Sequence, residues 1–433
     1  MSHIVVLGAG IGGVPAAFEL RAALGARHDV TIVSESDYFQ FVPSNPAVAL
    51  GWRESEAVLI HLPPIFQKLG VQHTAAGAAR VDPHENRVHL RDGGALDYDY
   101  LVIATGPQLA FDEVEGLGPA GHSHSICRTD EAALCARDWE AFLRDPGPMV
   151  VGAAQGASCF GPAYEYALCA VTELRRRKIR PRAPMTFVTP EPYIGHLGLD
   201  GVGDTKSMLE SILRDRDVHW IANAKINRVT AQSVEASELN DDGSVKKTHT
   251  IPSRFTMVLP AFRGVDCLRD ETGRFIEGLT NPRGFVVFDK TQRNPTFRNI
   301  FAVGVCTAIA PLAPTPVPVG VPKTGYMIES MVTAAVRNIV DLVAGVEPTA
   351  QASLNAVCLA DFGDNGVAFV ALPQIPPRNV NWSSEGYWVH LAKIGFEKYF
   401  LRKIRQGSSE PGYERIVMGA LGILRLMGGK GAP

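Results

Sequence analysis

The sequence lacks closely spaced cysteines, long apolar runs and a large net charge, and each absence excludes a class of protein. The seven cysteines are scattered over 433 residues with no CxxC pair and no zinc-ligand spacing, which argues against a disulfide framework and a zinc site. No window reaches the roughly 18 uninterrupted apolar residues of a membrane-spanning helix. A formal net charge of -3 lacks the basic excess expected of a nucleic-acid-binding protein.

An export signal is also missing from the N-terminus. Met1, Ser2 and His3 lead directly into an apolar strand, so there is no room for a charged segment, an apolar segment and a cleavage site. We therefore expect a chain that is not exported by a standard signal and that meets a membrane only as a peripheral protein. The length predicts more than one domain, with enough apolar residues for large cores.

A glycine-rich motif follows the first apolar run. Residues 4–7 (IVVL) are typical of a buried parallel strand, and the next six residues (GAGIGG) place a GxGxxG pattern between this strand and a helix expected at 14–24. The first glycine makes the tight turn, the second lets the backbone approach a pyrophosphate, and the third lets helix and strand pack closely. The residues predicted to bind the phosphates are Gly8, Gly10, Ile11, Gly12 and Gly13.

A carboxylate follows the second predicted strand at the distance that a ribose contact requires. This strand (VTIV) leads into Ser34 and Glu35, about 20 residues after the glycines. We predict FAD rather than NAD because the unit stands at the N-terminus and because a later segment looks like a flavoprotein element. Residues 98–106 (YDYLVIATG), which end in Thr105 and Gly106, resemble the stretch that closes the first part of an FAD domain in two-dinucleotide flavoproteins.

A second strand–helix–strand unit begins at residues 149–157 (MVVGAAQGA), with its helix expected at 163–178. Ala154 and Ala157 stand where the motif needs glycines, so the backbone cannot approach a pyrophosphate closely. Glu191, after the next strand, is a displaced candidate for the ribose acid. The two units predict an α/β fold with two Rossmann-like dinucleotide-binding domains, of which the second has lost nicotinamide binding.

Three further segments complete the expected organisation. Residues 299–305 (NIFAVGV) resemble the strand and Gly-Asp that bind the flavin ribitol, but Val305 replaces the aspartate and leaves the Gly304 amide as the donor. The proline-rich residues 311–322 predict a rigid wall of the site. The polar residues 240–247 predict a surface turn between strands.

Six longer runs around these motifs are far more specific than the glycines. They are residues 37–46 (DYFQFVPSNP), 156–166 (GASCFGPAYEY), 191–198 (EPYIGHLG), 322–329 (PKTGYMIE), 355–358 (NAVC) and 396–400 (FEKYF). Through them the chain resembles the sulfide:quinone oxidoreductases, relatives of the flavin subunit of flavocytochrome c sulfide dehydrogenase. The resemblance covers essentially the whole length.

The resemblance implies an enzyme that oxidises sulfide to polysulfide or sulfur, transfers two electrons to FAD and reduces a membrane quinone. By position, Cys159 and Cys358 match the redox-active pair. Cys127 matches the third cysteine, which either helps to release the sulfur chain or bonds covalently to the flavin. The further flavin contacts that the resemblance implies are Gln40, Pro43, Ala78, Gly304, Lys323 and Gly325.

Two titratable side chains are candidates for proton transfer on the sulfide side. His196 can titrate near neutral pH, but a hydrogen-bonded loop histidine fits the sequence equally well. Glu165 lies near the start of a predicted helix, where the helix dipole alone also favours a carboxylate. The resemblance suggests a second histidine where this chain has Glu131. Lys323 is expected to place a positive charge beside the reduced flavin.

The C-terminal residues are basic and amphipathic. Residues 388–433 contain 8 basic and 3 acidic side chains, and their apolar residues suggest two short amphipathic segments. Such segments fit the surface of an anionic bilayer, with a helix pair packed on the body or on another subunit as the alternative. By family position, Phe396 and Tyr413 sandwich the quinone ring and Lys393 lies nearby.

The expected organisation has three parts. An FAD domain comprises 1–110 and 290–345, a second Rossmann-like domain with active-site cysteines comprises 111–289, and a quinone- and membrane-associating region comprises 346–433. Three alternatives stay open: a sulfide dehydrogenase that passes electrons to a cytochrome, an NADH:quinone oxidoreductase, and a redox-sensing module that keeps FAD without turnover. The oligomeric state, including a homo-oligomer, stays open as well.

Overall fold

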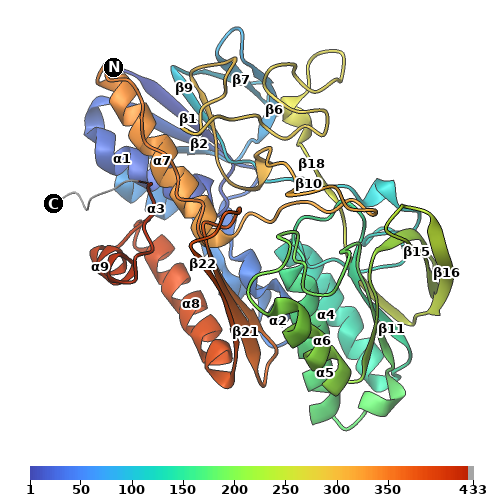
Figure 1. The fold of residues 1–433 in the computed structure, drawn as a ribbon. Coiled ribbons are helices and arrows are strands. Elements are labelled where there is room, and N and C mark those ends of the chain that lie inside the picture. The colour runs from blue at the N-terminus through green and yellow to red at the C-terminus, as the bar shows by residue number, and fades with distance from the viewer. Residues whose placement is uncertain (428–433) are drawn as a thin grey trace.

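Two parallel β-sheets organise residues 1–427, the part of the chain that the computed structural model describes (Figure 1). The end of the expected C-terminal region, 428–433, lies outside the described residues. The first sheet has the strand order β19-β9-β1-β2-β5. Its strands are β1 (His3–Leu7), β2 (Asp29–Val33), β5 (Gln72–Thr74), β9 (Tyr100–Ile103) and β19 (Ile300–Ala302).

The first sheet contains the predicted strand–glycine–helix–strand unit. Helix α1 (Gly13–Leu24) begins one residue before the expected start and runs beside α7 (Gly325–Val343) along this sheet (Figure 1). Both β1 and β2 are almost entirely buried, which is why their sequences are continuous apolar runs rather than alternating ones. The sequence-based prediction of this unit is confirmed.

The second sheet has the strand order β13-β12-β11-β17, again with all neighbours parallel. Helices α4, α5 and α6 gather beside it (Figure 1). Helix α5 begins at Gly161 and ends at Arg176, two residues before the expected bounds at each end. The elements are β11 (Met149–Ala153), β12 (Met185–Val188), β13 (Val218–Ile221), β17 (Phe255–Leu259), α4 (Thr129–Arg144), α5 (Gly161–Arg176) and α6 (Thr205–Asp215).

The antiparallel strands within residues 38–263 form four small sheets that are separate from the two parallel ones. The polar turn expected at 240–247 is shorter than predicted, because Val245 already begins β16 and places Lys247 within that strand. The antiparallel strands are β3 (Tyr38–Gln40) with β4 (Leu59–His61), β6 (Ala78–Asp82) with β7 (Arg87–Leu90) and β8 (Ala95–Asp97), β10 (Gln108–Leu109) with β18 (Phe262–Arg263), and β14 (Ala224–Val229) with β15 (Ser233–Leu239) and β16 (Val245–Pro252). Two short helices, α2 (Asn45–Ala49) and α3 (Pro63–Leu69), follow β3 and β4.

The C-terminal region contains a sheet that the sequence did not predict. Its three antiparallel strands precede the two helices that correspond to the expected amphipathic segments (Figure 1). Helix α8 packs on this sheet. Within residues 1–427, no helix combines the length and apolar character needed to cross a membrane. The elements are β20 (Ala356–Asp361), β21 (Gly366–Leu372), β22 (Val380–Glu385), α8 (Tyr387–Arg405) and α9 (Gly412–Ala420).

An aromatic contact holds α8 against the N-terminal part of the chain. Phe400 is buried, and its ring lies 6.1 Å from that of Phe39 and 5.1 Å from that of Phe41. Phe396, one turn earlier, lies 5.9 Å from Phe41. Ser44 and Arg53 also bond the Glu397 carboxylate, so α8 is fixed by both apolar and polar contacts.

Close packing explains two of the motif glycines. Gly8 has a φ of +99°, which favours glycine, and a Cβ there would lie 2.4 Å from the Ala104 carbonyl oxygen. A Cβ on Gly13 would lie 1.7 Å from the Gly8 carbonyl oxygen, whereas a Cβ on Gly10 would meet nothing within 4 Å. Gly8 and Gly13 are therefore needed for the fold itself, and Gly10 is not.

We expect Gly13→Ala to lower the free energy of unfolding by about 3 kcal/mol, because the new Cβ forces β1 and α1 apart. Gly10→Ala is the matched control, and it should change this free energy by less than about 0.5 kcal/mol. Urea denaturation of both variants measures the difference. Equal stability of the two variants would contradict the assigned packing role of Gly13.

We expect Phe400→Ala to lower the free energy of unfolding by about 3 kcal/mol, because it leaves a cavity beside Phe39 and Phe41. Leu391→Ala on the same helix removes a side chain that is 55% exposed, and it should cost less than about 0.5 kcal/mol. The midpoints of urea unfolding report both values. An equally large loss in the free energy of unfolding for Leu391→Ala would show that the face of α8 that carries Phe400 is not the one that holds the helix.

Candidate active site

A phosphate cradle lies at the carboxyl end of β1. The amides of Gly10, Ile11 and Gly12 have no backbone acceptor among the described residues, and they lead into the N-terminus of α1. Free amides and a helix N-terminus together bind anions. Because the space beside Gly10 is open, these residues fit the pyrophosphate of a dinucleotide.

The ribose end of the cradle is exposed. Ser34 is buried and its Oγ bonds the Ser36 carbonyl at 2.7 Å and the His73 ring at 2.9 Å. The Glu35 side chain is 58% exposed and forms an ion pair with Arg91. The contact between Glu35 and a ribose stays a prediction, and a bound ribose hydroxyl would share the Glu35 carboxylate with Arg91. Ala78, the first residue of β6, is half-buried.

The opposite end of the cradle is formed by the ends of β9 and β19 and by the start of α7. Thr105 and Gly106 follow β9 directly, and Gly304 follows β19 with a φ of +83°. A Cβ on Gly106 or on Gly325, the first residue of α7, would meet nothing within 4 Å. These segments therefore leave room for a ligand where the sequence predicted the flavin.

A cation and an unpaired hydroxyl mark the start of α7. Burial lowers the pKa of Lys323 to about 8, while the thiols of Cys306 and Cys159 act in the opposite direction. The Thr324 Oγ1 is buried and has no hydrogen-bond partner in the described structure. The sequence prediction missed Thr324, although a threonine directly before a helix is a recognisable N-cap. Both residues fit the polar edge of a flavin.

Cys159 lies near both Cys127 and Cys358, and all three are half-buried free thiols. Cys159 precedes α5, Cys358 lies in β20, which packs on α5, and Cys127 precedes α4. Burial raises the pKa of Cys159 to about 11 and those of Cys127 and Cys358 to about 12. The charge of Cys159 contributes to the raised pKa of each of the other two, so its sulfur is close to both.

A buried ion pair lies beside these thiols. Lys393 Nζ is 2.9 Å from Glu165 Oε2 and also donates to the Leu359 carbonyl, next to Cys358, at 3.2 Å. Burial raises the pKa of Glu165 to about 7, although Lys393 acts against this shift. Burial would lower the pKa of Lys393, but the Glu165 carboxylate raises it. Glu165 can therefore gain and lose a proton near neutral pH while Lys393 stays charged.

A carboxylate replaces the expected second histidine beside Cys127. Burial raises the pKa of Glu131, whose Oε2 has no hydrogen-bond partner in residues 1–427, and its charge raises the pKa of Cys127. The Thr129 amide donates to Gln40 Oε1 at 3.2 Å. Gln40 therefore lies beside the Cys127 segment, and Pro43 follows it in a short 3-10 turn.

His196 borders a hollow of about 520 Å³. Its Nδ1 accepts the Gly198 amide at 3.2 Å, so the neutral ring carries its proton on Nε2. Burial lowers the pKa of His196, and Asp200 opposes the shift. Residues 311–313 of the proline-rich segment form one wall of this hollow, and the prediction that the segment borders the flavin site stays a prediction. The hollow is lined by His196, Asp200, Ala310, Pro311, Leu312, Ala313, Ile375 and Pro376.

The prediction that Glu191 is a displaced ribose acid is wrong. Glu191 is fully buried, and its carboxylate accepts hydrogen bonds from Tyr164, Thr189 and the Leu197 amide. Burial raises its pKa to about 7, and these hydrogen bonds act against the shift. The carboxylate holds the His196 loop in place and is inaccessible to a nucleotide.

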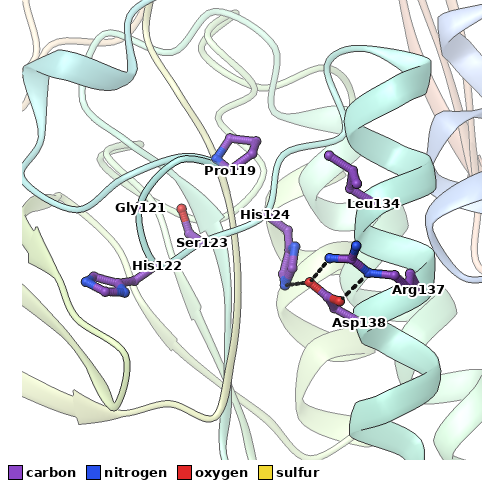
Figure 2. A pocket seen from close by; sticks show the side chains of 8 residues that line it. All are labelled: Pro119, Gly121, His122, Ser123, His124, Leu134, Arg137 and Asp138. Atoms are coloured by element: carbon purple, nitrogen blue, oxygen red, sulfur yellow. Dashed lines mark hydrogen bonds and ion pairs between the residues drawn. The ribbon is translucent and has the colours of Figure 1, made fainter.

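A second hollow, of about 260 Å³, lies between α4 and the loop before it (Figure 2). Burial lowers the pKa of His124, although Asp138 acts in the opposite direction, so the ring is neutral at pH 7. Arg137 bonds the same Asp138 carboxylate (Figure 2). The charges along this hollow neutralise each other, and it holds none of the predicted site residues.

The two candidate quinone aromatics lie on neighbouring helices. Phe396 of α8 is 36% exposed and Tyr413 of α9 is 55% exposed. The Tyr413 ring packs edge-on against Tyr399, 6.1 Å away and one turn of α8 beyond Phe396. Lys393, one turn before Phe396 on α8, has its ammonium group on Glu165. Its place near the quinone stays a prediction.

The basic character of the tail is largely internal. Lys393, Lys403 and Arg425 bind buried carboxylates, so they do not contribute to a surface charge. Within the described part of the tail, residues 388–427, the exposed basic side chains are Lys398, Arg402, Arg405 and Arg415. Much of α8 packs inward, whereas α9 has no buried residue. The exposed apolar residues of α9 and the turn after it, here called the α9 surface, are Tyr413, Ile416, Val417, Leu421, Leu424 and Met427.

Comparison with known proteins agrees with this geometry. Residues 2–154 match the family model described as pyridine nucleotide-disulphide oxidoreductase. The chain is 40% identical over 417 residues to the sulfide-quinone reductase of Aquifex aeolicus, which covers 96% of this chain and 94% of that protein. It is 26% identical over 311 residues to the mitochondrial sulfide:quinone oxidoreductase of Mus musculus, covering 70% of this chain and 65% of that protein.

A solved structure matches the whole fold. The X-ray structure of the Aquifex aeolicus sulfide:quinone oxidoreductase superposes with a TM-score of 0.93 at 39% identity and covers 100% of this chain and 99% of that one. A Plasmodium falciparum NDH2 in complex with NADH shares the fold alone, with a TM-score of 0.57 at 14% identity. By its near full-length identity and its superposition, the chain belongs to the sulfide:quinone oxidoreductase family of flavoproteins.

Proposed function

We propose that this protein oxidises sulfide and reduces a membrane quinone, with FAD as the electron carrier. The observation that carries the proposal is the approach of Cys159 to Cys358 beside the Glu165–Lys393 pair, in a chain 40% identical to a named sulfide-quinone reductase. A nicotinamide donor is disfavoured because Ala154 and Ala157 replace motif glycines and Glu191 is buried.

The residues of the cradle fit FAD. The amides of the glycine motif would hold the pyrophosphate, and Glu35 would bond a ribose hydroxyl. Lys323 and the start of α7 would place positive charge at one edge of the flavin and favour its reduced form. Bound FAD supplies two-electron acceptance from sulfur and two-electron donation to quinone. The remaining residues proposed to line it are Gln40, Pro43, Ala78, Thr105, Gly106, Gly304 and Gly325.

The sulfur chemistry begins with a bridge between Cys159 and Cys358. Hydrosulfide attacks one sulfur of this bridge, the S–S bond breaks, and the products are a persulfide on one cysteine and a thiolate on the other. The thiolate, which we assign to Cys358, then bonds to the persulfide sulfur as two electrons leave to the cofactor. The persulfide proton passes to Glu165, and the new bridge is longer by one sulfur. Repetition lengthens the chain until it is released.

Four other side chains are proposed to assist at this side of the site. Cys127 lies close to Cys159 and is proposed to take part in release of the sulfur chain. Lys393 and Lys323 both lower the pKa of Cys159, so they stabilise its thiolate against the effect of burial. His196, whose neutral ring borders the hollow behind the proline-rich segment, is proposed to exchange protons with solvent.

The quinone is proposed to bind between Phe396 and Tyr413. Aromatic side chains with one exposed face are suited to stack on a quinone ring. The α9 surface would enter the interfacial region of a bilayer, where apolar side chains gain most of the binding free energy. This arrangement makes the protein peripheral and gives it direct access to a lipid-dissolved acceptor.

Removal of either paired cysteine is expected to abolish the sulfide half-reaction. In Cys159→Ala and Cys358→Ala, the loss of flavin absorbance on addition of sulfide should slow by more than about 1,000-fold, because the nucleophilic pair is broken. Cys267→Ala, which removes a buried cysteine beside the first sheet, is the matched control and should bleach normally. Stopped-flow absorbance under anaerobic conditions measures the rate.

The same assay decides the role of Cys127 and the identity of the electron partners. Undiminished turnover of Cys127→Ala would rule out an essential role for this thiol.

Fast bleaching of the wild type by sulfide, followed by reoxidation with a soluble quinone analogue, supports the proposed function. Bleaching by NADH, or reoxidation only by a cytochrome, would contradict it.

The pKa of Glu165 predicts how the rate of flavin bleaching by sulfide depends on pH. Because burial raises this pKa to about 7, the proton-accepting form is present above pH 7 and is lost below it. The bleaching rate of the wild type relative to Glu165→Gln should therefore rise between about pH 6 and 8, to a factor of about 100. Dividing the wild-type rate by the variant rate removes the effect of sulfide ionisation, because that effect is the same for both proteins. Glu173→Gln, on the same helix, is the control, and a flat ratio would exclude Glu165 as the base.

A further inference from the structure

A buried network of charged side chains joins α8 and the C-terminal segment to the helices of the first sheet. It contains four carboxylates and two cations from four helices and from the segments that precede and follow α9. Its members, here called the charge network, are Glu19 of α1, Glu329 of α7, Lys403 of α8, Glu410, Glu414 of α9 and Arg425.

Arg425 is the centre of the charge network. Its guanidinium lies 3.3 Å from Glu19, 3.2 Å from Glu329, 3.3 Å from Glu410 and 2.7 Å from Glu414. Lys403 pairs with Glu329 and lies 3.4 Å from Glu414. The side chains of Lys403 and Arg425 are only 1% and 4% exposed.

Arg415 of α9 also pairs with Glu410, at 2.9 Å, but three cations cannot neutralise four carboxylates. With all seven groups ionised, the network would carry one uncompensated negative charge in a largely buried place, which is costly, so it retains a proton instead. Burial raises the pKa of Glu414 to about 7, the charge of Glu329 acts in the same direction, and Arg425 opposes it. Burial also raises the pKa of Glu19, against the effects of Arg425 and Ser409.

One hydroxyl connects this network to the candidate quinone site. Tyr399 Oη donates to Glu414 Oε2. The Tyr399 ring packs against Tyr413, and Phe396 lies one turn away on the same helix. The Tyr399 hydroxyl thus connects the charge network to a ring that lies beside the aromatic residues proposed to hold the quinone.

We propose that Tyr399 and Glu414 form the route by which a proton reaches the quinone. The inference rests on the proposed quinone site between Phe396 and Tyr413. Reduction of a quinone to a quinol requires two electrons and two protons. Bound flavin would supply both electrons and the one proton that it takes up from solvent when sulfide reduces it, and the second proton comes from the Tyr399 hydroxyl. Glu414 returns a proton to Tyr399 and recovers one from solvent through the network.

A purely structural role for the network makes a different prediction. Glu410 also forms ion pairs with Arg425 of the C-terminal segment and with Arg415, but no hydrogen bond or ion pair joins it to Tyr399 among the described residues. If the network serves only to hold this segment, Glu410→Gln and Glu414→Gln should be equally harmful. If it carries protons, only Glu414→Gln and Tyr399→Phe should affect the quinone step.

The test separates the two half-reactions of the holoenzyme. Tyr399→Phe, Glu414→Gln, Glu410→Gln and Phe396→Ala are reduced anaerobically with sulfide and then mixed with a short-chain ubiquinone analogue. Bleaching by sulfide should be unchanged in all four. Reoxidation at pH 6 should slow at least tenfold in Tyr399→Phe and Glu414→Gln, because a general acid has been removed, and less than twofold in Glu410→Gln.

The pH profile gives a second readout. The donating form of Glu414 is the protonated one, so wild-type reoxidation should fall as pH rises above about 7, and this fall should be absent in Glu414→Gln. Glu165 and Glu191 also titrate near pH 7, so the infrared readout is the difference between the wild-type and variant spectra of the oxidised holoenzyme. The wild type minus Glu414→Gln should show a protonated carboxyl band that disappears near pH 7, and the wild type minus Glu410→Gln should lack it.

Two results would overturn the inference, and they differ from a failure of the proposed quinone site. Normal reoxidation of Tyr399→Phe, or equal slowing in Glu410→Gln, would exclude the proton route while Phe396→Ala still weakens quinone binding. An unchanged half-saturating quinone concentration in Phe396→Ala would instead reject the quinone site and the proton route together.

Discussion

The buried ion pair between Glu165 and Lys393 is the interaction on which the rest of the site depends. A charge removed from water is stable only when a partner and hydrogen bonds replace the lost solvent. Glu165 comes from α5 and Lys393 from α8, and the same ammonium group bonds the backbone of β20 beside Cys358. The pair thus fixes three distant segments against one another, and removal of either member would leave an uncompensated charge beside the thiols.

Helix α8 carries a buried cation toward each end. Lys393 faces the thiol side and Lys403 faces the charge network, while Phe396 and Tyr399 lie between them. One rigid element therefore connects the proposed sulfur chemistry with the proposed quinone chemistry. In this arrangement the cofactor carries electrons between the two sides, while each side has its own buried carboxylate, Glu165 or Glu414, with a pKa near neutral pH.

Some expectations from the sequence failed for identifiable physical reasons. Glu191 follows a strand as a ribose acid would, but the Tyr164 hydroxyl and the Leu197 amide enclose its carboxylate. The basic residues of the tail suggested a charged surface, but carboxylates from other segments neutralise three of them internally. The β20 strand went unpredicted because most of its residues are half-buried on both faces, so its sequence has no alternating pattern.

The sequence by itself determined the strand–glycine–helix unit, because GxGxxG requires a tight turn and close helix packing within a few residues. It also proposed the site cysteines, through long runs that resemble those of a family. Only the tertiary structure decided which side chains meet. The partners of Lys393, Glu414 and Arg425 lie on other elements, and no periodicity records them. Their roles depend on burial, since desolvation and the sum of neighbouring charges set whether a buried carboxylate keeps its proton.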